Sequence, residues 1–289
     1  MSEAPAFERL LKRDRVITLA GLAVLCALAW FYIVAGAGLG MSASEMTTLT
    51  LFPHLQAHDI MPSMPDMPGM DMSGVTSPGR TAWGFAQWAL MIAMWWIMMI
   101  AMMTPSAAPA ILIYARVHRH ALARGQVQDE LAPTGAFASG YLLVWLGFAV
   151  AAATLHWALE GTGLVSAMMM GSRSRWLSGA VLIAAGLYQF SPLKNACLGL
   201  CRSPAVFVSR HWRPHRLGAL RLGAMHGAHC VGCCWMLMAL LFVGGVMNLV
   251  WIAALAILVL VEKVLPAGRW VGRGAGVVMI AWGGATLMV

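Results

Sequence analysis

Two histidines and three cysteines stand close together in the stretch 226–234, at positions His226, His229, Cys230, Cys233 and Cys234. An α-helix turns about 100° per residue, so these five side chains share one helix face within an arc of roughly 140°. Imidazole and thiolate are ligands that suit zinc, Cu(I) and other soft or borderline metals. The spacing therefore predicts a metal site. The alternative is that the cysteines pack as small apolar residues and the histidines bond to neighbouring carbonyls.

A second pair of cysteines, Cys197 and Cys201, lies in a CxxxC motif between the Ser-Pro pairs at 191–192 and 203–204. The two residues are about one helical turn apart and can face the same point. A short basic segment joins this motif to the helix that carries Cys230. We therefore expect both groups of cysteines, with His226, to form one site.

Methionines dominate the Pro- and Gly-rich stretch 42–80, at Met61, Met64, Met67, Met70 and Met72. This spacing cannot form a packed helix, and thioethers are soft ligands that select Cu(I). The stretch is predicted to be an exposed loop that captures copper or silver. The alternative is a low-complexity linker.

A second methionine pattern follows in the apolar segment 81–104, where Met91, Met94, Met98 and Met102 form a narrow stripe on one helix face. Such a stripe is more often ordinary packing, because methionine fills irregular gaps well. A path for a metal ion is the alternative that the thioethers permit.

The elements that must position these residues are membrane helices. The chain is 60% hydrophobic and only 10% charged, whereas soluble domains carry about 25% charged residues. We predict a single all-α integral membrane domain over residues 1–289, a bundle of about seven transmembrane helices. The expected spans are 16–40, 81–104, 134–158, 175–190, 217–245, a sixth ending near 265, and 270–289. Pro105 and Pro109 should break or kink the second helix, and the amphipathic piece 111–124 should lie on lipid headgroups.

The distribution of Lys and Arg predicts the orientation. With the N-terminus inside, 16 of the 19 basic residues fall in inner segments, and only Arg80, Arg173 and Arg175 fall outside. This places the methionine-rich loop 42–80 in the periplasm and the cysteine motifs near the cytoplasmic face. That compartment is reducing, which favours thiols or metal ligands over disulfides. Glu262 and Lys263 are expected to mark the inner end of the sixth span.

Several function classes are excluded or disfavoured. The net charge of +8 comes from residues at the ends of apolar spans, so it does not indicate nucleic-acid binding. The chain has no P-loop and no CxxCH haem motif, which argues against a primary pump and a c-type cytochrome. No catalytic residue is predicted, and we favour a role other than that of an enzyme.

Several motifs together resemble a known family: the run 102–109, the segment 191–204 with its CxxxC, the segment 226–235, residues 245–248 and Glu262-Lys263. From about residue 80 onward the chain is similar to the bacterial family called predicted metal-binding integral membrane protein, domain of unknown function 2182. That resemblance implies a membrane location and metal binding, without a settled activity. His229 departs from the family pattern, where an aromatic residue is common.

Taken together, the patterns predict a multi-pass protein of the bacterial inner membrane that handles a soft metal, with Cu(I) favoured and zinc second. Its partners would be the metal ion, membrane lipids and another membrane metalloprotein, in copper transport or as a metallochaperone. Two alternatives stay open: a membrane metalloenzyme or thiol redox protein, and a structural helper with a zinc-like site.

Overall fold

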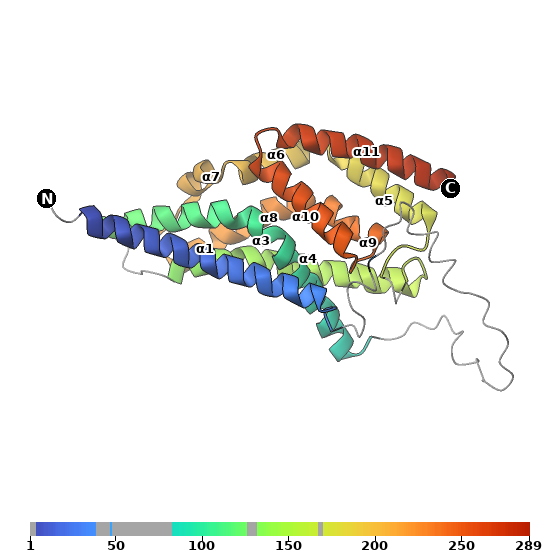
Figure 1. The fold of residues 1–289 in the computed structure, drawn as a ribbon, viewed down its shortest axis with the longest axis horizontal. Coiled ribbons are helices and arrows are strands. Elements are labelled where there is room, and N and C mark those ends of the chain that lie inside the picture. Colours follow the sequence, from blue (N-terminus) through green and yellow to red (C-terminus); the bar gives the residue numbers. More distant parts are fainter. Residues whose placement is uncertain (1–3, 39–46, 48–82, 126–131, 167–169) are drawn as a thin grey trace.

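The computed structural model describes residues 4–38, 47, 83–125, 132–166 and 170–289, and these form an elongated bundle of helices (Figure 1). The elements are α1 (Ala4–Val34), α3 (Phe85–Ala123), α4 (Ala132–Gly161), α5 (Arg175–Tyr188), α6 (Pro192–Arg202), α7 (Pro204–His211), α8 (Arg216–Ala239), α9 (Leu241–Gly244), α10 (Leu249–Val264) and α11 (Gly268–Met288). Within these ranges the only β-structure is an isolated bridge between Val165 and Ser172. The all-α prediction is confirmed for the described residues.

Five of these helices are long and apolar enough to cross a membrane. The bent pair α5–α6 raises the number to six if it is counted as one span. Helix α10 has 16 residues, so it is about 24 Å long, against a hydrocarbon core of about 30 Å. Several helices are thus suited by length and composition to span a membrane, while the count of seven and the orientation remain predictions.

Of the break or kink expected at Pro105 and Pro109, helix α3 shows no break, because both prolines lie inside one helix of 39 residues. Proline removes a backbone donor and bends a helix without having to end it, and α3 bends along its length (Figure 1). The segment 111–124 is therefore not a separate surface piece. His118 is 1% exposed, and its ring stacks on Tyr114 inside the bundle.

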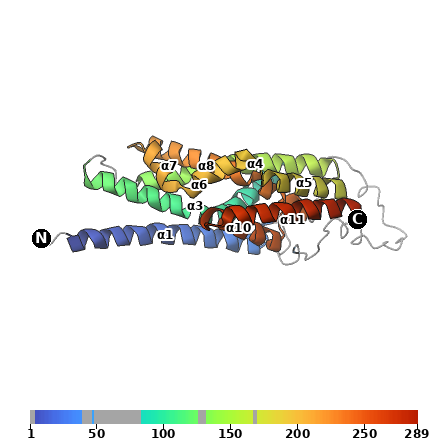
Figure 2. The same cartoon turned by 90° about the horizontal axis from the view of Figure 1, so that it is seen from above.

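Glycines allow the helices to approach closely, as small residues do in membrane bundles. A Cβ added to Gly223 of α8 would lie 1.9 Å from the carbonyl oxygen of Phe137 in α4, and one added to Gly140 would lie 2.0 Å from that of Leu220. Helices α5 and α11 lie side by side in the same manner (Figure 2), with Gly276 against the backbone of Gly186. The bundle is thus held at backbone contact along two helix pairs.

The predicted orientation of the bundle can be tested with reporter fusions. A reporter fused near residue 74 should behave as an exported protein, because the Lys and Arg residues gather on the other side of the predicted spans. Paired alkaline phosphatase and green fluorescent protein fusions measure this. Fluorescence together with absent phosphatase activity would reverse the topology.

Candidate metal centre

Helix α8 carries the cysteine motif on its buried face. Cys230, Cys233 and Cys234 are each 1% exposed. The expectation that 226–234 forms one helix with these side chains on a common face is confirmed, since all five residues lie within α8. Helix α8 packs against α4 and α6, which close this face off from its surroundings.

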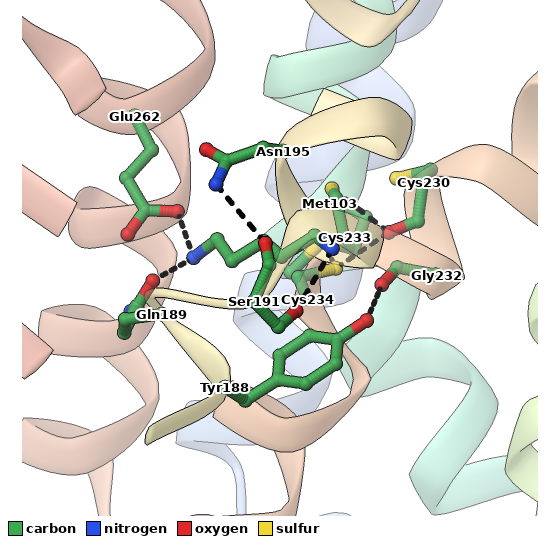
Figure 3. Close-up of polar contacts among 11 residues, drawn as sticks. Met103, Tyr188, Gln189, Ser191, Asn195, Cys230, Gly232, Cys233, Cys234 and Glu262 are labelled. Atoms are coloured by element: carbon green, nitrogen blue, oxygen red, sulfur yellow. Dashed lines mark hydrogen bonds and ion pairs between the residues drawn. The ribbon is translucent and has the colours of Figure 1, made fainter. Parts of the chain in front are cut away.

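The thiols of α8 converge on one backbone carbonyl. Cys233 Sγ donates a hydrogen bond to the carbonyl oxygen of Cys230 at 3.1 Å, and Cys234 Sγ donates to the same oxygen at 2.9 Å. The Cys234 thiol also lies close enough to interact with the thiols of Cys230 and Cys233. Figure 3 shows these cysteines grouped around the α8 backbone.

Helix α6 brings the CxxxC motif to the same place. A bend of 62° separates α5 from α6, and Ser191 caps α6 by accepting a hydrogen bond from the Lys194 backbone N–H at 3.0 Å. The Cys201 thiol interacts with that of Cys233. Cys197 Sγ faces the bare backbone of Gly232, where an added Cβ would lie 2.9 Å from the sulfur. The structure therefore brings the two cysteine groups together.

A thioether and a phenol from neighbouring helices complete this cluster. Cys234 Sγ lies 3.9 Å from Met103 Sδ of α3. The hydroxyl of Tyr141 in α4 lies 3.1 Å from Cys230 Sγ and 3.3 Å from the carbonyl oxygen of Met103. Neither Met103 nor Tyr141 was predicted as a site residue, because Met103 lies about 100° from Met102 around the helix, off the predicted stripe, and a single tyrosine carries no spacing signal. We call Met103, Cys201, Cys230, Cys233 and Cys234 the sulfur cluster.

A lysine reaches the sulfur cluster from α10. Lys263 Nζ donates to Cys230 Sγ at 2.8 Å and to Ser106 Oγ at 3.2 Å. Lys263 is 8% exposed and Glu262 is 2% exposed. The two residues do lie at the end of the helix, as expected, since α10 ends at Val264, but both side chains turn into the bundle.

Glu262 pairs with the lysine of α6 beside the cluster. Lys194 Nζ donates to Glu262 Oε2 at 2.7 Å, and it also hydrogen-bonds to Gln189 Oε1. Figure 3 shows Gln189 and Glu262 on one side of this network and the cysteines on the other. Charged side chains buried in a membrane protein point to function by default. That rule would have singled out Lys194, Glu262 and Lys263 had they not been assigned to span ends.

The two histidines of α8 lie among aromatic rings. His226 is buried, and its ring centre lies 5.9 Å from that of Tyr141 and 5.6 Å from that of Phe207. His229 Nδ1 donates to the carbonyl oxygen of Met225 at 2.6 Å, which leaves Nε2 with the free lone pair. The bond to a neighbouring carbonyl is the alternative that the sequence left open for this residue.

The described residues contain no group of three or more His, Cys, Asp or Glu side chains already set around a metal position. The hydrogen bonds explain this, because two of the thiols point at a carbonyl oxygen instead of a common centre. A metal held by these cysteines would require their thiols to turn away from this carbonyl oxygen. The donor set fits Cu(I), since thiols and thioethers are its preferred ligands.

The predicted methionine sites have different outcomes. Met91, Met94, Met98 and Met102 are buried along α3, each 4% exposed or less. Their helix continues directly to Met103 of the sulfur cluster. Met61, Met64, Met67, Met70 and Met72 lie outside the described residues.

Comparison with protein families gives one match. A family model described as PpoB2, copper chaperone, matches residues 92–286. The matched range contains the sulfur cluster and the buried Lys194, Glu262 and Lys263. Searches of curated proteins and of solved structures return no match.

Proposed function

The chain belongs to the copper chaperone family whose model matches residues 92–286, and we propose that it holds Cu(I) as cargo inside the bacterial inner membrane. The sulfur cluster, with Cys197 beside it, is the holding site. The cargo is then passed to another membrane metalloprotein or across the membrane. We also propose that the chain is related to the family called domain of unknown function 2182.

The observation that carries the proposal is the mixture of donors at the sulfur cluster. The thiols of Cys230, Cys233 and Cys234 are buried, Cys201 is half-buried, and Cys234 Sγ lies 3.9 Å from the Met103 thioether. Sulfur donors favour Cu(I), whereas Mg²⁺ and Ca²⁺ require oxygen ligands. The burial of Cys230, Cys233 and Cys234 also keeps water away from these sulfurs, which protects Cu(I) from oxidation.

The methionines of α3 supply a route to this site. One face of α3 carries Met91, Met94, Met98 and Met102, and Met103 is the last methionine of that helix. Thioethers bind Cu(I) without a charge, and thiolates bind it more tightly. A metal that enters among thioethers therefore gains stability as it moves toward the thiols. The loop 42–80 is proposed to collect the ion at the start of this route.

The hydrogen bonds of the metal-free site also favour release of Cu(I). The carbonyl oxygen of Cys230 accepts from Cys233 and Cys234. When an acceptor removes Cu(I), the thiolates of Cys233 and Cys234 take up protons from the medium and can then donate to this oxygen. This suits a carrier that must bind and give up its cargo.

The proposal is tested by loading and transfer. Full-length protein in detergent micelles, reduced and kept without oxygen, should retain about one Cu(I) per chain after desalting. It should release the ion to a chromophoric Cu(I) chelator of higher affinity, and a hundredfold excess of Zn(II) should not displace it. Plasma mass spectrometry measures the first result and chelator absorbance the second. Protein that retains no Cu(I), or that exchanges it freely for Zn(II), would contradict the proposal.

A further inference from the structure

The sulfur cluster has one cation facing it. Of the described Asp, Glu, Lys and Arg side chains, three are buried: Lys194, Glu262 and Lys263. Lys194 and Glu262 form an ion pair at 2.7 Å and cancel each other. The positive charge of Lys263 therefore has no carboxylate partner among the contacts that the structure gives, only a sulfur and a hydroxyl.

The helix geometry separates these two charges. Glu262 and Lys263 are consecutive residues of α10, so their side chains leave the helix about 100° apart. Glu262 points toward α6, where Lys194 lies, and Lys263 points toward Cys230 of α8 and Ser106 of α3. The carboxylate is thus engaged on another side of the helix.

We propose that Lys263 is a specificity-determining residue that favours a monovalent over a divalent metal at the sulfur cluster. This inference rests on the proposed function. A net charge in a water-excluded site is costly. Cu(I) and the Lys263 ammonium together carry two positive charges, which two thiolates balance. With the same two thiolates, Zn(II) or Cu(II) would leave one positive charge uncompensated, so a divalent ion requires a third buried thiol of the cluster to ionise.

The contact of Lys263 with Cys230 makes the effect direct. The Lys263 ammonium lies 2.8 Å from Cys230 Sγ, one of the proposed ligand atoms. At such a distance the interaction energy of two unit charges exceeds thermal energy even at an intermediate dielectric constant. Without the ammonium, Cu(I) with two thiolates is an anion in an apolar site. Zn(II) with two thiolates is then neutral.

Lys263→Gln tests this inference, because it keeps an unbranched polar chain, removes the charge and adds no sulfur donor. Cu(I) affinity, measured by chelator competition in micelles, should fall by about tenfold or more. Zn(II) affinity, measured with a fluorescent Zn(II) indicator, should stay the same or rise. Lys263→Arg keeps the charge and should recover at least half of the lost Cu(I) affinity on a logarithmic scale.

Ser106→Ala is the matched control. It removes the other hydrogen bond of Lys263 and leaves the charge, so Cu(I) affinity should stay within about threefold of the parent protein. Circular dichroism and gel filtration in detergent must show parent-like helix content for each variant compared. Unchanged Cu(I) affinity in Lys263→Gln, or an equal loss in Ser106→Ala, would overturn the inference. Failure of the parent protein to bind Cu(I) would instead overturn the proposed function.

Discussion

Cys233→Ser is expected to weaken Cu(I) binding by about 100-fold or more. Cys233 is the residue whose thiol meets both cysteine groups, through Cys201 on α6 and Cys234 on α8. Serine keeps a hydroxyl that can donate to the Cys230 carbonyl, so the local hydrogen bond survives. Removing a group that only supports a metal ligand already lowers metal affinity by about 10–100-fold. Removing a soft ligand itself should lower the affinity by at least as much. Copper per chain after desalting measures the effect.

Cys26→Ser provides the control for that experiment. Cys26 is a free cysteine of α1 whose thiol donates to the carbonyl oxygen of Ala101 at 3.6 Å, outside the sulfur cluster. Its replacement should leave copper loading unchanged. Equal copper content in Cys233→Ser and the parent protein would mean that the cysteines of α8 serve only as small packing residues.

Gly223→Ala is expected to be the most damaging single-methyl change in the bundle. The new Cβ would lie 1.9 Å from the Phe137 carbonyl oxygen, and that oxygen belongs to a helix backbone that cannot rotate away. Overpacking lowers the stability of a folded protein by about 1–3 kcal/mol when side chains can adjust. A clash with backbone atoms should therefore lower stability by at least the upper value of that range. Helix α8 would shift away from α4, and with it Cys230 would leave Tyr141. Thermal unfolding in detergent should show a lower midpoint together with lower copper retention.

Gly147→Ala separates this effect from the general consequence of replacing glycine in a helix. Gly147 lies in α4, and a Cβ there would meet no atom within 4 Å. Alanine favours the helix by about 1 kcal/mol over glycine, so this variant should match or exceed the parent midpoint. Similar midpoints for both variants would mean that α4 and α8 are not held at backbone contact.

Helix periodicity was sufficient to predict one part of the site. The rotation of 100° per residue puts Cys230, Cys233 and Cys234 on one face, and that face is buried. Gly223 lies against the backbone of a neighbouring helix, while Gly274, which also stands in a glycine-rich stretch of helix, has nothing within 4 Å of an added Cβ. A glycine pattern shows that contact is allowed, and only the neighbouring helix decides whether it occurs.

The charged half of the site could not be predicted in this way. Lys194 follows a Ser-Pro pair and Lys263 ends an apolar run, and both positions are typical of residues at a membrane surface. The 62° bend between α5 and α6 turns Lys194 inward to Glu262, a residue 68 positions away in the chain. No local pattern encodes a pairing at that separation.

That long separation has a consequence for biosynthesis. Helix α6 leaves the ribosome well before α10, so Lys194 has no carboxylate partner while α6 first meets the membrane. A lysine alone is poorly tolerated in lipid, and α6 would gain its final place only when Glu262 arrives. Glu262 and Lys263 in turn enter on a helix of 16 residues whose charges have partners in α3, α6 and α8. Insertion of the last third of the chain is therefore a joint event, in which late helices recruit earlier ones.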